Sequence, residues 1–255
     1  MVLTYTLARR VGYNRSSLRG ISVQSQELYK GAIGRFQCHY GWTWLLLLDQ
    51  KKSIESVVKA AKISGTKVPK LPYPLDGPSL SKADNAKNEA EANEVAKTPY
   101  RAIVGILSYI MEHTKPDTAY ALNVLSRYRN NPGRRHVEFL LCLVKYCEYS
   151  KDDRLKFHAH PGPYDAKTMR SLTQARFQCH ADLTGNLDNS HSTSAHIGYL
   201  WHHSVVSFTS KTQGSLSTST AESEIKAVKQ CLKEEALVMR GMLILMGFPK
   251  EATRR

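Results

Sequence analysis

The stretch Ala175-Arg176-Phe177-Gln178-Cys179-His180-Ala181-Asp182 alternates between small or apolar side chains and polar ones. A period of two residues is typical of a β-strand that buries one face and exposes the other. Residues 196–201 and 204–209 are also β-prone, and His202-His203 between them predicts the turn of a hairpin. The sequence therefore predicts three antiparallel strands in this region.

A helix is expected directly after these strands. Ser219-Thr220-Ala221-Glu222 has the form of a capping box, in which serine and glutamate satisfy free N–H groups at a helix start. Helical spacing gives the set of side chains that we expect on the buried side: Ala221, Ile225, Val228 and Leu232. Gly247-Phe248-Pro249 predicts the end of the last apolar stretch.

Upstream of the strands the pattern becomes helical. Three helices joined by short turns are expected between residues 100 and 149, because apolar side chains recur there at three- and four-residue spacing. Their expected inward positions are Ile103, Val104, Leu107, Ile110, Met111, Tyr120, Val124, Leu125, Tyr128, Val137, Leu140, Leu141 and Val144. We also predict an amphipathic helix at 52–63, a mobile polar linker at 81–98, and no sustained pattern in 1–50.

Composition places the chain among globular proteins. Its 255 residues are 42% hydrophobic, which is enough to bury a core. Five scattered cysteines exclude a disulfide scaffold and favour a reducing compartment, so we expect an intracellular location, cytoplasmic or nuclear. No apolar run approaches the ~18 residues that a membrane-spanning helix needs. Residues 1–26 are basic and acid-free, which resembles a transit peptide or, equally, a disordered basic start.

The chain carries 36 Lys and Arg against 22 Asp and Glu, a formal net charge of +14. A cationic surface attracts polyanions, and nucleic acid is the usual one. The candidate phosphate-binding residues are Arg127, Arg129, Arg134, Arg135 and Lys145. The alternative for these residues is a solvated helix face that binds nothing. We expect no membrane partner, and the oligomeric state stays open.

Several spaced blocks of the sequence occur together in one order. The upstream blocks are Tyr100-Arg101-Ala102-Ile103-Val104-Gly105, Lys115-Pro116-Asp117-Thr118-Ala119-Tyr120-Ala121, Leu125-Ser126-Arg127-Tyr128, and Pro132 with His136. The downstream blocks are Ser192-Thr193-Ser194, Ser207-Phe208-Thr209-Ser210-Lys211-Thr212-Gln213 and Ser217-Thr218-Ser219-Thr220-Ala221-Glu222-Ser223-Glu224. As a set, they resemble the Pol polyprotein of copia-type LTR retrotransposons (Pseudoviridae-like), over roughly residues 52–250.

This resemblance implies an α+β fold, in which a helical connection unit precedes an incomplete ribonuclease H-like domain with helices on a mixed sheet. The domains would be a poorly structured basic segment (1–51), a thumb or connection remnant with a linker (52–99), a helical connection region (100–170) and a truncated ribonuclease H-like domain (171–255). The family is an RNA-directed DNA polymerase and ribonuclease H, which cleaves the RNA of an RNA–DNA hybrid with two Mg²⁺ ions.

The resemblance also assigns the metal ligands. His180 occupies the position of the family's first aspartate, Asp182 matches the second aspartate of that motif, and Glu224 matches the glutamate of the following helix. Imidazole is a poor ligand for Mg²⁺, and Asp182 is displaced by ~6.5 Å along the strand. A third aspartate would follow Gly-Phe-Pro on a further strand, after the point where this sequence stops. We therefore expect Glu224 and Asp182 as the catalytic and metal-binding candidates, without productive binding of Mg²⁺.

The expected function is that of a Pol fragment from the reverse transcriptase/ribonuclease H region, catalytically defective and able to bind RNA–DNA hybrid or duplex. The polymerase palm carries two adjacent aspartates, but Asp152-Asp153 is the only such pair here and is predicted to be a solvated turn. Two alternatives stay open: a non-enzymatic nucleic-acid-binding module, and a decayed transposon remnant. Zinc is not favoured, because the Cys and His residues lack paired spacing.

Overall fold

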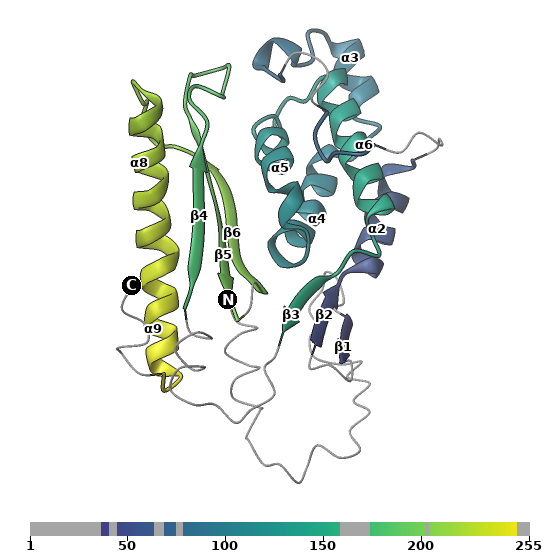
Figure 1. Ribbon diagram of the computed structural model, residues 1–255. Helices are drawn as coiled ribbons and strands as arrows, with labels where there is room; N and C mark the ends of the chain where they lie inside the picture. Colours follow the sequence, from purple (N-terminus) through teal and green to yellow (C-terminus); the bar gives the residue numbers. More distant parts are fainter. Residues whose placement is uncertain are drawn as a thin grey trace.

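The computed structural model describes residues 37–40, 45–63, 69–74, 79–158, 174–201 and 204–248. These residues form a helical unit and two separate three-stranded antiparallel sheets (Figure 1). The expected α+β class is therefore confirmed. The sequence predictions for residues 1–36, including the transit peptide, and for His202-His203 lie outside the described residues.

The helical unit contains the helices that the sequence predicted. Its elements are α2 (Lys51–Ala61), η1 (Lys82–Asp84), α3 (Glu89–Val95), α4 (Tyr100–His113), η2 (Pro116–Thr118), α5 (Ala119–Ser126) and α6 (Arg134–Tyr149). Aliphatic side chains of α2, α4 and α6 form the core, in which Ile54, Ile103 and Leu140 are at most 1% exposed. Tyr120 was expected to face inward but is 43% exposed, because α5 packs through Ala121 and Leu122 instead.

Residues 81–98 are structured, so the expected mobile linker is wrong. The side chain of Asn88 caps α3 by accepting a hydrogen bond from a backbone N–H three residues on. Two ion pairs hold the segment on α6: Glu94–Arg134 at 2.5 Å and Asp84–Arg135 at 2.7 Å. The prediction failed because caps and ion pairs stabilise this segment, and neither produces an apolar period.

The first sheet joins distant parts of the chain. β2 (Leu45–Asp49) lies between β1 (Gln37–Tyr40) and β3 (Leu155–His158), and both pairings are antiparallel. Residues 45–51 therefore do not belong to a poorly structured segment, and the region 100–170 is not helical throughout. Local sequence patterns could not predict the pairing of β2 with β3, because the whole helical unit separates these two strands in the sequence.

The second sheet agrees with the predicted strands. β4 (Arg176–Ala181), β5 (Thr193–Leu200) and β6 (Ser204–Thr212) pair in that order, and each pairing is antiparallel. Side chains along β4 alternate between exposed and more buried positions, as the two-residue period predicted. The mixed sheet that the resemblance implied is not observed in the described strands, because all of their pairings are antiparallel.

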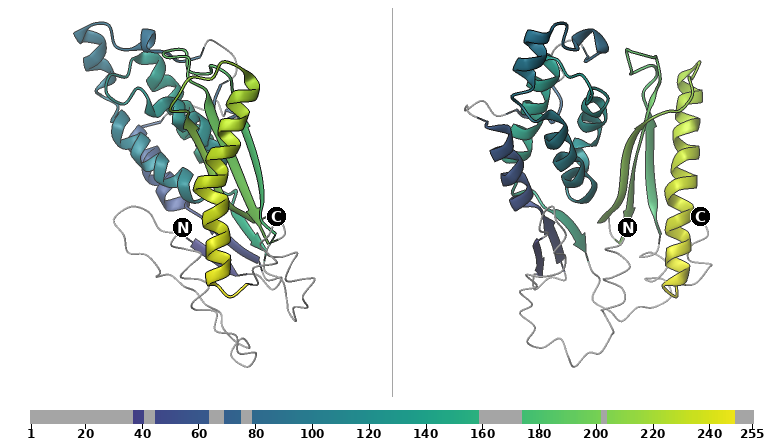
Figure 2. Two further views of the ribbon diagram at one scale, coloured as in Figure 1. Left: turned by 90° about the vertical axis from the view of Figure 1, so that its left-hand side faces the viewer. Right: turned by 180° about the vertical axis from the view of Figure 1, so that it is seen from behind.

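One long helix follows, made of α8 (Thr220–Cys231), the π-helical turn η3 (Leu232–Ala236) and α9 (Leu237–Leu245). It lies on the side of the second sheet that faces away from the helical unit (Figures 1 and 2). The Ser219 hydroxyl caps α8 by accepting from the Glu222 N–H at 3.2 Å. Only half of the predicted capping box forms, since the Glu222 carboxylate accepts from Thr218.

The buried side of α8 differs from the prediction. The residues that contact the sheet side are small: Ser223, Ala227 and Cys231, each at most 2% exposed. The predicted apolar side is exposed instead, with Ile225 at 68%, Val228 at 45% and Leu232 at 53%. Helical spacing predicted one apolar stripe on this helix, but the sheet packs against a different stripe of small side chains, which permits close approach of the backbones.

The helical unit meets the second sheet through polar side chains. The Arg127 guanidinium donates to the hydroxyls of Thr193 and Thr212, each at 3.3 Å. Asp188, in the loop between β4 and β5, accepts from the Lys82 N–H at 2.7 Å and lies 3.1 Å from the Tyr128 hydroxyl. These contacts fix the position of the sheet relative to the helices.

We predict that Asp188→Ala lowers the free energy of unfolding by about 1–2 kcal/mol, because it removes the acceptor of the Lys82 N–H and one of the two acceptors beside the Tyr128 hydroxyl. Urea denaturation followed by circular dichroism measures the change. Asp153→Ala, in the exposed turn after α6, is the matched control and should change stability by less than about 0.5 kcal/mol. Equal effects of the two substitutions would show that the Asp188 contact contributes nothing.

His136 adds a pH-dependent element to the helical unit. Its ring stacks on Tyr128 at 4.1 Å, and its Nδ1 accepts from the Gly133 N–H at 2.9 Å. Burial lowers the pKa of His136, while Asp84 opposes the shift. A proton on Nδ1 would face the Gly133 N–H, so the folded chain holds the neutral ring. Burial lowers the pKa of His196 in the same way.

Because both histidines have lowered pKa values in the folded chain, the unfolded chain takes up protons first as the pH falls. Stability is full above the ordinary histidine pKa of about 6.5 and should decrease from there toward pH 5, by at most about 1.4 kcal/mol per pH unit for each group. Urea midpoints across this range measure the slope. His136→Asn keeps an acceptor for Gly133 and should flatten it; an unchanged slope would exclude His136 as a contributor.

Candidate functional site

Glu224, a predicted metal ligand, meets His180, which occupies the position of the family's first aspartate. His180 lies near the end of β4 and Glu224 lies in the second turn of α8, and the His180 Nδ1 atom is 2.8 Å from a Glu224 carboxylate oxygen. The contact is open to solvent, with the His180 side chain 81% and the Glu224 side chain 33% exposed. It arises because α8 packs along β4 and the Ser219 cap fixes where the helix begins.

Asp182, the other predicted ligand, has a different contact. Its Oδ1 accepts a hydrogen bond from the Thr193 N–H, the first residue of β5. Gly185 lies against the same carboxylate, where a side chain would collide with it. Asp182 therefore closes the loop between β4 and β5, and the structure describes no contact that joins it to Glu224.

These residues do not fit the two-magnesium site that the resemblance implies. Mg²⁺ prefers several oxygen ligands, whereas Glu224 is paired with an imidazole nitrogen and Asp182 accepts a backbone N–H. Within the described ranges, no three His, Cys, Asp or Glu side chains gather into a group that could hold a metal ion. The His180–Glu224 pair instead links β4 to α8.

A trio of polar side chains lies deeper under the long helix. The Ser207 hydroxyl donates to Glu235 at 2.7 Å, and the His196 Nε2 atom lies 3.8 Å from the same carboxylate. His196 is only 6% exposed. A nucleophilic serine would donate to the histidine, whereas the Ser207 hydroxyl donates to the glutamate and lies 3.5 Å from the His196 Nε2 atom. The trio therefore anchors the π-helical turn to the sheet.

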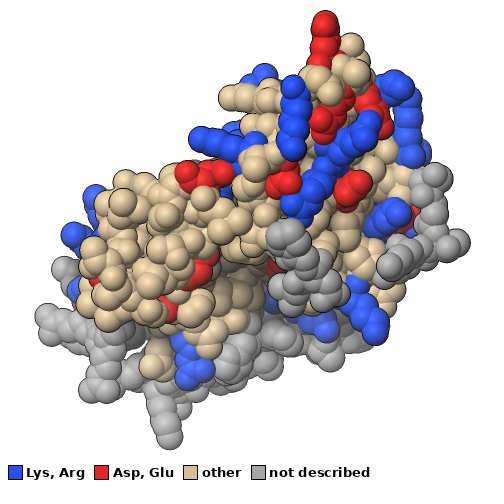
Figure 3. All heavy atoms as spheres, turned by 90° about the horizontal axis from the view of Figure 1, so that it is seen from above, with Lys and Arg blue, Asp and Glu red and all other residues tan. Residues whose placement is uncertain are grey.

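Most of the predicted phosphate-binding residues have partners inside the chain. Arg134 pairs with Glu94, and Arg135 pairs with Asp84 and lies over the Phe139 ring at 5.8 Å. The residue Arg127 holds the second sheet, as described above, and Lys145 is half-buried on α6. Figure 3 shows basic and acidic side chains side by side over the helical unit. The sequence could not predict this pairing, because the acids lie 40 and 51 positions upstream of their partners.

Arg129 is the predicted residue that stays exposed without an ion pair among the described residues, and Arg101 lies near it. The Arg101 guanidinium donates to the Asn130 side chain at 2.9 Å. Beside them is a hollow of about 180 Å³, lined in part by Tyr100 and Asn131. Arg101 was missed as a candidate, since the turn that brings Asn130 back to α4 is a tertiary feature.

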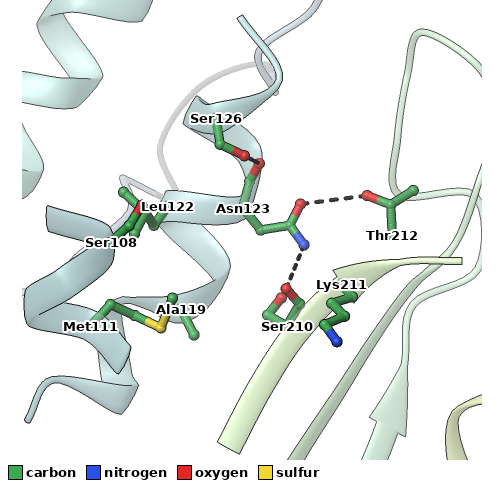
Figure 4. Close-up of a pocket in the computed structure, with 9 residues that line it drawn as sticks. All are labelled: Ser108, Met111, Ala119, Leu122, Asn123, Ser126, Ser210, Lys211 and Thr212. Carbon is green, nitrogen blue, oxygen red and sulfur yellow. Dashed lines mark hydrogen bonds between the residues drawn. The ribbon is translucent and has the colours of Figure 1, made fainter. Parts of the chain in front are cut away.

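A larger hollow of about 400 Å³ lies between the helical unit and β6 (Figure 4). Asn123 spans it by donating to the Ser210 carbonyl at 2.8 Å. The Ser210 hydroxyl is buried and has no hydrogen-bond partner among the described residues. The lining residues include no carboxylate, thiol or imidazole, and the titratable side chain among them, Lys211, pairs with Glu234 at 3.1 Å.

The chain is similar in sequence to Pol polyproteins of transposons. It is 34% identical over 192 residues to the retrovirus-related Pol polyprotein from transposon TNT 1-94 of Nicotiana tabacum, over 74% of this chain and 13% of that protein. The chain is related to copia-type Pol polyproteins. Those of transposons RE1 and RE2 of Arabidopsis thaliana are 30% and 32% identical, over 54% of this chain and 8% and 9% of those proteins.

The expected relationship to copia-type Pol polyproteins is thus confirmed, and the chain spans 13% or less of the length of these relatives. No family model matches the sequence, and no solved structure matches the fold. The ribonuclease H-like assignment therefore stays a prediction. Among the helices in the described part of the chain, none is long and apolar enough to cross a bilayer.

We predict that His180→Asp gives this Pol-related chain a stability that depends on Mg²⁺, because it sets two carboxylates side by side. With a dissociation constant of about 1 mM, 10 mM Mg²⁺ would add about 1.4 kcal/mol. Urea denaturation with and without the ion measures the gain. Neither the unsubstituted chain nor the matched control His180→Asn should respond. A response of the unsubstituted chain that Glu224→Gln removes would contradict the argument.

Proposed function

We propose that this chain is a Pol-derived module that binds RNA–DNA hybrid or duplex and does not cleave it efficiently. The observation that carries the second part is the 2.8 Å contact between His180 and Glu224, which occupies the carboxylate that a metal would need. The first part is supported by the relationship to Pol polyproteins and by the formal charge of +14.

The exposed end of the helical unit is the surface we assign to the ligand. Arg101 and Arg129 are exposed there, and neither has an ion pair among the described residues. Guanidinium groups in this state can contact phosphate oxygens without first breaking an internal salt bridge. Arg134 is also exposed, but its pairing with Glu94 opposes such a contact.

We also propose a cellular location for the chain. A nucleic-acid ligand fits a cytoplasmic or nuclear location, and Cys147, Cys179 and Cys231, which form no disulfide, fit a reducing compartment. A decayed remnant with no stable fold is the competing interpretation. It predicts the absence of a cooperative unfolding transition, which the denaturation experiments above would detect.

Fluorescence anisotropy with a labelled RNA–DNA hybrid tests the binding. We expect affinity to fall steeply between 50 and 200 mM salt, which are assay conditions for counterion release. Arg101→Ala and Arg129→Ala should each reduce the salt slope by about one. Arg134→Ala is the matched control and should change affinity less, because Glu94 already neutralises that side chain. Binding that is insensitive to both salt and these substitutions would refute the proposed surface.

Cleavage is tested on the same hybrid with Mg²⁺ or Mn²⁺. The expected result is an intact RNA strand after incubation with the full chain. A contaminating nuclease is recognised by activity that persists in Glu224→Gln. Hybrid cleavage that depends on Glu224 would instead overturn the second half of the proposal and leave the first half standing.

A further inference from the structure

The outer face of the long C-terminal helix is apolar and uncovered. Ile225, Val228, Leu232 and Leu237, which we call the outer stripe, are 68%, 45%, 53% and 60% exposed. They lie on the side of the helix away from the small residues that contact the second sheet. Monomeric proteins rarely expose such continuous apolar surface without a binding role.

The π-helical turn keeps this stripe continuous. In an uninterrupted α-helix, Leu237 would be rotated by roughly 140° from Leu232, because each residue turns the helix by about 100°. The extra residue accommodated in η3 (Leu232–Ala236) removes about one such step, which returns Leu237 toward the same side. The turn is held in place by the Ser207–Glu235 hydrogen bond. The π-helical turn thus keeps the exposed apolar side chains of α8 and α9 on the same side of the helix.

The charge beside the stripe selects the kind of partner. Every acidic residue of the helix is engaged inside the chain, in the contacts Glu222–Lys226, Glu224–His180, Glu234–Lys211 and Glu235–Ser207. In contrast, Lys229, Lys233 and Arg240 are exposed and have no ion pair among the described residues. Lys229 lies one turn from both Ile225 and Leu232, so the uncompensated charge at the stripe is positive.

We propose that the outer stripe docks an acidic amphipathic helix of a partner protein. Leucine-type side chains of the partner would pack on Ile225, Val228 and Leu232, and its flanking carboxylates would face Lys229 and Lys233. A second copy of this chain would bring the same positive charges together. Nucleic acid would satisfy the lysines but leave the apolar row exposed. This surface is separate from Arg101 and Arg129, so its failure and that of the proposed nucleic-acid binding are distinguishable.

A fluorescein-labelled synthetic helix tests the proposal, with leucines at i, i+3, i+4 and i+7 and glutamates on both flanks. Anisotropy titration with the full chain should show saturable binding. Ile225→Ser combined with Leu232→Ser should weaken it by about tenfold or more, as expected for central apolar contacts. Leu187→Ser, which changes a 61% exposed leucine in the loop between β4 and β5, should change it by less than about twofold.

Charge reversal gives a second, independent readout. Lys229→Glu combined with Lys233→Glu should weaken binding of the acidic peptide and strengthen binding of a peptide with lysines in place of the glutamates. All substitutions are at exposed positions, and urea denaturation verifies that the variants fold.

Several results would overturn the proposal. One is absence of saturable binding by the acidic peptide. Another is a dimer, seen by light scattering, that Ile225→Ser with Leu232→Ser abolishes, since a second copy would then be the occupant. Sedimentation with vesicles of 3:1 phosphatidylcholine and phosphatidylserine that needs the outer stripe would identify a lipid surface instead. Loss of hybrid binding in that double variant would assign the stripe to nucleic acid.

Discussion

The contact between the helical unit and the second sheet is polar, and the relative position of these two parts depends on it. The helices and the second sheet have separate apolar cores, one around Ile103 and Leu140 and the other around Leu200 and Leu243. Between them lie the hydrogen bonds of Arg127, Asn123 and Asp188. Because hydrogen bonds are directional, this contact fixes one orientation without a continuous core. It also accounts for the hollow beside β6 and removes Arg127 from the surface available to phosphate.

A single change of residue type alters the chemistry near the start of α8. A carboxylate at position 180 would repel Glu224 and call for a cation between them, whereas the imidazole of His180 pairs with Glu224 directly. The geometry that brings the two residues together is therefore compatible with either outcome. The relationship to Pol polyproteins concerns the sequence as a whole, whereas the contact with Glu224 depends on the side chain at position 180.

The long helix illustrates how packing can reverse an amphipathic pattern. Ser223, Ala227 and Cys231 recur every four residues and form a row narrow enough for the helix to lie close to the sheet. The larger Ile225 and Leu232 side chains then point outward. Hydrophobicity alone favoured the opposite orientation, since burial of large side chains releases more free energy. The close approach of the helix and sheet backbones and the contacts of Cys231 with the sheet favour the observed orientation, in which the small side chains face the sheet.

The sequence by itself determined the local elements: the helices between 100 and 149, the alternating strand at 175–182, the hairpin after it and the cap at Ser219. It also determined the relationship to Pol polyproteins, since the spaced sequence blocks quoted above occur in the chain in the same order. Only the tertiary structure decided the pairing of β2 with β3, the ion pairs that order residues 81–98, and the meeting of His180 with Glu224. Periodicity and capping act over a few residues, whereas these contacts join positions 40 or more residues apart, whose proximity depends on the packing of the whole chain.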